Sequence, residues 1–91
     1  MAKPTFEVFQ ASARKALLRA DGSADLLVQK GPSFHFYDDG LVDSLDMLDI
    51  AFYIDQDIKV KIDLESLIHG EVDMTLQNLY DSIRTVHQPP A

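Results

Sequence analysis

Ser44 is the residue whose type and position best suit covalent chemistry. It follows an aspartate in the stretch DDGLVDSLDMLDIAF, where a glycine-marked loop is expected to turn into a helix. A serine or aspartate at such a point also serves as a helix N-cap, accepting a hydrogen bond from a free backbone N–H of the first turn. The residue types therefore leave two interpretations open: Ser44 or Asp43 caps the helix, or the Ser44 hydroxyl is a site of modification.

The sequence gives Ser44 little support as a self-activated nucleophile. No G-x-S-x-G elbow surrounds it, and a triad would have to recruit His35, His69 or His87 in a domain with little room for a pocket. The spacing of these histidines matches no recognised zinc site, and the chain has no cysteine. We therefore expect neither catalytic residues nor a metal site.

The length of 91 residues, nearly half of them apolar, predicts one small domain over 1–91 with a modest core. A chain of this size buries only about 60% of the surface of its unfolded form, which disfavours a deep catalytic cavity. The N-terminus lacks the pattern of a signal peptide, and no apolar run approaches the ~20 residues of a membrane span. We expect a monomer in the cytoplasm.

The net charge of −7 is concentrated in one segment. Residues 31–58 contain no lysine or arginine, and their acidic residues are Asp38, Asp39, Asp43, Asp46, Asp49, Asp55 and Asp57. Nucleic acid is a disfavoured partner, because phosphate backbones need lysine and arginine to replace their counterions. A basic protein surface is the partner that this charge favours, with a solvated acidic face that only aids solubility as the alternative.

Hydrophobic periodicity predicts an all-α fold with almost no strand signal. The predicted elements are a helix over about 5–20, a loop over 21–43, a helix over about 44–58, a short helix over about 63–68, a helix over about 75–86 and a flexible tail over 87–91. Residues 23–29 could add a helical turn to the long loop, and Phe34, Phe36 and Tyr37 are expected to hold this loop against the core. Residues 60–62 could form a strand, but no second run is available to pair with it.

The helix over 44–58 carries two apolar stripes when residues are placed about 100° apart around its axis. The stripe that we expect to face the core consists of Met47, Ile50, Ala51, Ile54 and Ile58. The other, here called the outer stripe, consists of Leu45, Leu48 and Phe52. Asp49 and Gln56 border the outer stripe on one edge, and Ser44 and Asp55 on the other. An apolar stripe edged by acids is typical of a docking surface, unless the long loop covers it.

These residues carry a resemblance to a known family. The run Asp43-Ser44-Leu45-Asp46, the apolar and acidic residues that follow it and the later Ile58 and Ile62 resemble the attachment motif and second helix of acyl carrier proteins. The wider phosphopantetheine-binding family, with its aminoacyl and peptidyl carriers, is similar too. The likeness extends from about residue 34 through the last helix and is most specific over 38–58. It implies a small four-helix bundle with three main helices and a short third one.

The resemblance implies a protein that catalyses nothing. Ser44 would receive a 4′-phosphopantetheine arm from coenzyme A, transferred by a separate phosphopantetheinyl transferase. The thiol of the arm would hold an acyl group as a thioester and carry it between enzymes of fatty acid, lipid or specialised-metabolite biosynthesis. Asp43 and Leu45 would flank the arm. The residues that would meet basic docking patches on acyl- or aminoacyl-activating and transferring enzymes are Leu45, Leu48, Asp49, Phe52, Asp55 and Gln56.

The sequence departs from the family pattern in two places that bear on the cargo. The approach GPSFHFYDDGLV differs from the Leu-Gly-Ala-like approach of fatty-acid carriers, and residues 63–73 fit the short third helix of the family poorly. The approach is closer to stand-alone carriers of specialised pathways, some of which hold amino acids. An aminoacyl or peptidyl carrier of the same fold is therefore the alternative.

Two hypotheses come from other classes of protein. Asp55, Asp57 and Asp63 suggest a calcium site, but Lys59 occupies a ligand position of the EF-hand loop and Val60 stands where that loop requires glycine. The second hypothesis is an acidic helical adaptor without a prosthetic group, which would use the outer stripe only to bind a partner.

The crowding of carboxylates predicts a salt-dependent stability. Repulsion among the acids of residues 31–58 should lower the melting temperature at neutral pH and low ionic strength, and moderate salt or divalent cations should raise it. Calorimetry across a salt series checks this expectation. A melting temperature indifferent to salt would contradict it.

Overall fold

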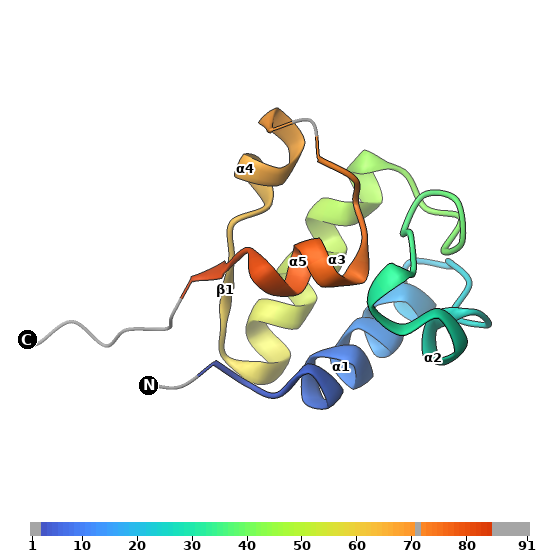
Figure 1. The fold of residues 1–91 in the computed structure, drawn as a ribbon, viewed down its shortest axis with the longest axis horizontal. Coiled ribbons are helices and arrows are strands. Elements are labelled where there is room, and N and C mark those ends of the chain that lie inside the picture. The colour runs from blue at the N-terminus through green and yellow to red at the C-terminus, as the bar shows by residue number, and fades with distance from the viewer. Residues whose placement is uncertain (1–2, 71, 85–91) are drawn as a thin grey trace, which may run out of the picture.

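Helices enclose one hydrophobic core in the computed structural model, which describes residues 3–70 and 72–84 (Figure 1). In that part of the chain the elements are α1 (Phe6–Arg19), α2 (Leu27–Lys30), the 3-10 turn η1 (Gly31–Ser33), α3 (Ser44–Ile58), β1 (Lys61–Ile62), α4 (Leu64–His69), α5 (Leu76–Asp81) and β2 (Ile83–Arg84). The prediction of a small, mostly helical domain is confirmed.

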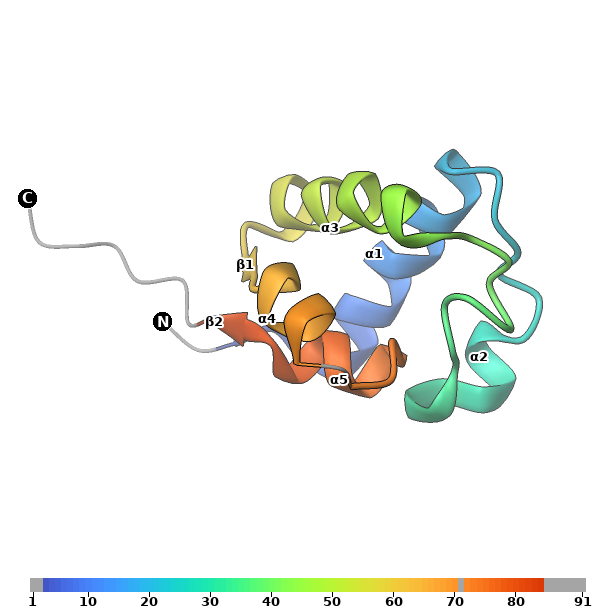
Figure 2. The same ribbon diagram turned by 90° about the horizontal axis from the view of Figure 1, so that it is seen from above.

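The two longest helices, α1 and α3, pack against each other and supply much of the core. Phe9 and Leu17 of α1 are fully buried, as are Met47 and Ile54 of α3, so the stripe predicted to face the core does so. Thr5 caps α1 by accepting a hydrogen bond from the Val8 N–H at 3.2 Å. Figure 2 shows α3 and α5 on opposite sides of the molecule, and the core lies between them.

The connection between α1 and α3 is more ordered than the loop predicted over 21–43. It contains α2 and η1, so its helical residues are 27–30 rather than 23–29. Phe34 and Phe36 are fully buried and meet edge to face, with ring centroids 5.5 Å apart. The Phe36 N–H donates to the Met74 carbonyl at 2.9 Å. These contacts hold the connection against the segment before α5, as expected from the sequence for the two phenylalanines.

The helix predicted over 75–86 is shorter in the structure. α5 ends at Asp81, and β2 then pairs antiparallel with β1, with Ile62 opposite Ile83. The expectation that residues 60–62 have no strand partner was therefore wrong. Both isoleucines are buried in the pair, so long-range pairing outweighs the local helical spacing. Val86 and the predicted tail over 87–91 lie outside the described residues.

An ion pair links the ends of the paired strands β1 and β2. Arg84 lies 2.7 Å from the Asp63 carboxylate, which also caps α4 by accepting from the Ser66 N–H. The Asp63 N–H donates in turn to the Ser82 carbonyl at 3.1 Å. The end of α5 and the start of α4 are therefore joined through both backbone and side chain.

Asp55 joins the end of α3 to β1. Its carboxylate accepts a hydrogen bond from the Ile62 N–H at 2.9 Å, and its backbone carbonyl accepts from the Val60 N–H at 3.2 Å. Between them the chain reverses through Lys59, which has left-handed backbone angles. Partial burial raises the pKa of Asp55, although the hydrogen bond from Ile62 acts in the opposite direction.

We predict that Asp55→Ala lowers the free energy of unfolding by about 1–3 kcal/mol, because the Ile62 N–H loses its acceptor. Asp55→Asn keeps an acceptor oxygen and should cost less. Since the folded protein holds a proton on Asp55 more tightly than the unfolded chain, the wild type loses stability at this site as the pH rises above the ordinary value of 3.8.

Urea unfolding of the three proteins at about pH 4 and about pH 7 measures both effects. The stability of the Asn variant relative to wild type should increase between these two conditions. Equal losses for the Ala and Asn variants would show that Asp55 does not anchor β1.

Candidate functional site

Asp43, and not Ser44, caps α3. The Asp43 carboxylate accepts a hydrogen bond from the Asp46 N–H at 2.9 Å, and the Asp46 carboxylate accepts from the Asp43 N–H at 3.1 Å. These reciprocal bonds form a capping box, which fixes the first turn of the helix. Of the two residues that the sequence offered as caps, the structure uses the aspartate.

Ser44 therefore has no role in the helix cap. It is the first residue of α3, it is exposed, and its hydroxyl makes no hydrogen bond to any residue in the described ranges. The N–H groups of Ser44 and Leu45 also find no acceptor there. A phosphodiester formed on the Ser44 oxygen would lie where these donors and the helix dipole stabilise an anion. The donor set at this helix end therefore fits a phosphopantetheine linkage.

Neither of the two described histidines, His35 and His69, forms a hydrogen bond with the Ser44 hydroxyl. The His35 ring accepts a hydrogen bond from the Asp38 N–H at 3.4 Å, and His69 on α4 lies 4.0 Å from Glu65. His87 lies outside the described residues. Over residues 3–70 and 72–84, no cluster of three or more potential metal-ligating side chains forms either. A catalytic triad built on Ser44 has no support in this part of the chain.

The outer stripe lies open to solvent. Leu45, Leu48 and Phe52 are 72%, 55% and 65% exposed, so the long connection does not cover them. Leu41 just before the helix, which the predicted outer stripe did not include, is 71% exposed as well. Leu41 has a positive φ of 58°, a backbone conformation that apolar periodicity does not predict. The exposed leucines and Phe52 flank the head and middle of α3.

The acids around the outer stripe have different surroundings. Asp49 and Gln56 are exposed and make no side-chain hydrogen bond or ion pair with the described residues. Asp55, by contrast, is half-buried and holds the Ile62 N–H. The structure thus sets Asp49 and Gln56 beside the stripe as free polar groups, whereas Asp55 also serves the fold.

Two other aspartates of the acidic segment are neutralised by lysines. Asp57 lies 3.0 Å from Lys15 of α1, and Asp39 lies 2.8 Å from Lys30. The Lys30 ammonium and the His35 N–H hold the pKa of Asp39 below its usual range. Unpaired negative charge is therefore left mainly along α3 and at its start.

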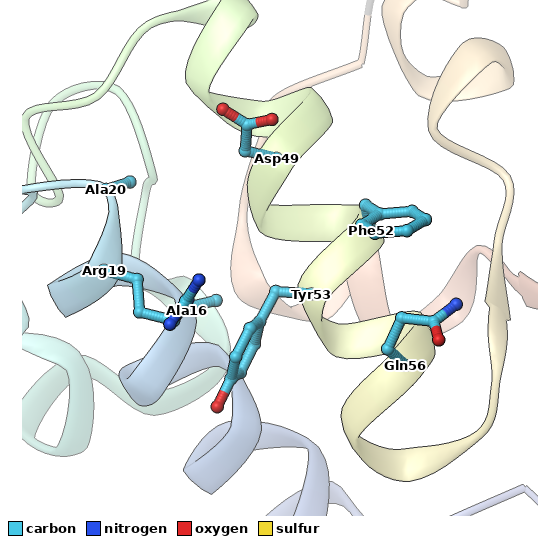
Figure 3. Close-up of a pocket in the computed structure, with 7 residues that line it drawn as sticks. All are labelled: Ala16, Arg19, Ala20, Asp49, Phe52, Tyr53 and Gln56. Atoms are coloured by element: carbon cyan, nitrogen blue, oxygen red, sulfur yellow. The ribbon is translucent and has the colours of Figure 1, made fainter.

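A pocket of about 410 Å³ opens beside Phe52, between α1 and α3 (Figure 3). Its lining residues are Ala16, Arg19, Ala20, Asp49, Phe52, Tyr53 and Gln56. The Arg19 guanidinium lies over the Tyr53 ring, 5.1 Å from its centroid. The walls of this pocket come from two helices far apart in the chain, so residue spacing alone does not predict it.

No protein-family model, curated protein or solved structure matches this chain. Over the residues that the structure describes, no helix has both the length and the apolar character needed to cross a membrane.

The capping geometry predicts opposite outcomes for two neighbouring substitutions. Asp43→Ala removes the acceptor for the Asp46 N–H and should lower the free energy of unfolding by about 1 kcal/mol. Ser44→Ala removes a hydroxyl that makes no hydrogen bond with the described residues, so the free energy of unfolding should change by less than about 0.5 kcal/mol. Chemical denaturation of the unmodified proteins measures both. A larger loss for Ser44→Ala than for Asp43→Ala would mean that the serine is the cap.

Proposed function

We propose that this protein is an acyl-carrier-like protein that holds acyl intermediates as thioesters on a 4′-phosphopantetheine arm attached to Ser44. The observation that carries the proposal is made at the start of α3. Asp43 caps the helix there, and the Ser44 hydroxyl is exposed and has no hydrogen-bond partner among the described residues. Within residues 3–70 and 72–84 no side chain hydrogen-bonds to the Ser44 hydroxyl, which agrees with a carrier, because a separate enzyme would supply the base. The helical architecture is compatible with this family.

The attachment step would be carried out by a phosphopantetheinyl transferase. The Ser44 oxygen would form a bond to the phosphorus of coenzyme A that bears pantetheine, as the serine proton passes to a base of the transferase. The bond from that phosphorus to the bridging pyrophosphate oxygen would break, and adenosine 3′,5′-bisphosphate would leave. When bound, the arm supplies the thiol that the chain itself lacks. The protein's own contribution is an accessible oxygen at a helix N-terminus that stabilises the phosphodiester anion.

The exposed face of α3 suits brief encounters with basic enzymes. The outer stripe supplies apolar contact, and the net charge of −7 supplies long-range attraction. Electrostatic steering of this kind raises association rates without requiring tight binding. A carrier that must leave each enzyme after delivery benefits from fast, weak and salt-sensitive association.

We predict that incubation with coenzyme A, magnesium and a broad-specificity phosphopantetheinyl transferase adds one phosphopantetheine to the wild-type protein. The reason is that Ser44 is exposed at the head of α3 and is not needed for its cap. Intact-mass spectrometry checks the result, with Ser44→Ala as the variant that should gain nothing. Ser33→Ala is the control at another exposed serine, whose hydroxyl donates to the Lys30 carbonyl at 3.0 Å, and it should leave the gain unchanged.

A folded wild-type protein that gains no mass would overturn the proposal. The adaptor hypothesis would then take its place, in which the outer stripe binds a partner without any prosthetic group. Equal modification of wild type and Ser44→Ala would instead show that another residue is the acceptor.

A further inference from the structure

Leu41 combines two features that are unfavourable in the free protein. Its φ angle is 58°, in the left-handed region that a leucine adopts only at an energetic cost, and its side chain is 71% exposed. The other described non-glycine residues with positive φ are Asp21 and Lys59, which follow the ends of α1 and α3, where this conformation is common. Leu41 follows no helix end, so its conformation needs another explanation.

The residues on either side of Leu41 hold its backbone in place. Gly40 and Val42 are both buried. The Gly40 carbonyl accepts a hydrogen bond from the Ser23 N–H at 2.8 Å, and the Val42 N–H donates to the Phe36 carbonyl at 3.4 Å. A strained residue that its surroundings fix in this way is more common at functional sites than elsewhere. The structure therefore presents an exposed leucine on a constrained backbone.

Leu41 lies close to Ser44. The two residues are three positions apart, so their Cα atoms are separated by at most roughly 10–11 Å. On the other side of the serine, Leu45 is 72% exposed. An enzyme that acts on the Ser44 oxygen must cover the surface around it, and burial of these two leucines would then favour the complex.

The charge around the two leucines indicates the chemistry of the matching surface. The Asp38 side chain is 83% exposed, and Asp43 is exposed as well. Residues 31–58 contain no lysine or arginine that would neutralise them from within the segment. A complementary protein surface has an apolar depression bordered by lysines and arginines.

We propose that Leu41 is a recognition residue for the phosphopantetheinyl transferase, and that it enters an apolar depression with a basic rim beside the active site of that enzyme. This inference depends on the proposed carrier function. It adds to the docking surface a residue that precedes α3 and lies outside the outer stripe. Burial of the leucine in the complex offsets the cost of its conformation and exposure in the free protein.

The test measures the kinetics of loading with coenzyme A, magnesium and a broad-specificity transferase. Leu41→Asn removes the apolar contact but keeps a side chain that tolerates the left-handed conformation. This variant should lower kcat/KM by about tenfold, the factor expected when roughly half of a leucine side chain is no longer buried in the complex. The loss should lie in KM for the carrier, with kcat nearly unchanged, because a docking contact stabilises the bound complex and the transition state alike.

Two further variants serve as controls. Leu41→Met keeps an apolar side chain of similar volume and should lose no more than about threefold in kcat/KM. Val28→Asn makes the same kind of change at another exposed apolar residue, 72% exposed on α2, and should leave kcat/KM unchanged. Figure 2 shows α2 on the side of the molecule away from α3.

Thermal melting of the unmodified proteins separates recognition from folding. Leu41→Asn should melt no lower than wild type, because asparagine adopts the left-handed conformation at less cost than leucine. A lower melting temperature would show that the Leu41 side chain supports the fold, which would contradict the proposed role.

A salt series tests the basic rim. Added salt should lower kcat/KM of wild type and Leu41→Asn by the same factor, because the substitution leaves all charges in place. Loading that is indifferent to salt would reject the basic rim.

The remaining outcomes distinguish this inference from the carrier function. Equal loading kinetics of wild type and Leu41→Asn would reject Leu41 as a recognition residue and leave the carrier function intact. A loss for Leu41→Met as large as that for Leu41→Asn would show that apolar contact is not what the enzyme recognises. A folded wild-type protein that gains no phosphopantetheine would instead reject the carrier function, together with this inference.

Discussion

The reciprocal hydrogen bonds between Asp43 and Asp46 cap α3, and the proposed modification of Ser44 depends on them. They fix the first helical turn with two carboxylates, and the serine between them is not required for the cap. If Ser44 made the cap, its oxygen would be engaged with a backbone N–H and modification would cost the helix its first turn. With an aspartate in that role, the hydroxyl can be modified while the helix keeps its stability. The proposed carrier function depends on this arrangement.

The packing of α1 against α3 gives the central helix two surfaces with different tasks. One apolar stripe packs in the core, where Met47 and Ile54 are fully buried. The outer stripe stays exposed, which is costly for a small domain unless a partner or ligand uses it. Where α1 ends beside the middle of α3, the two helices leave the pocket that holds Arg19 and Asp49. An exposed apolar stripe and a pocket thus arise from one helix pair.

Local patterns in the sequence predict the long helices and the exposed serine, whereas features that depend on distant contacts are missed. The apolar spacing of α1 and α3 is strong enough to place both within a few residues. Serine and aspartate are equally good caps, so the sequence alone left Asp43 and Ser44 undecided. The pairing of Ile62 with Ile83 shortens α5, and no local signal reveals that pairing. The pocket depends on the juxtaposition of α1 with α3, which residue spacing does not encode.

Peptide mapping of the protein isolated from the cells that produce it tests the central claim most directly. Residues 31–58 contain no lysine or arginine, so tryptic cleavage after Lys30 and Lys59 releases Ser44 within a single peptide. The account predicts that tandem mass spectrometry finds phosphopantetheine, with or without cargo, on the Ser44 oxygen of that peptide. A population in which Ser44 is unmodified in every molecule, or in which the group is attached elsewhere, would contradict it.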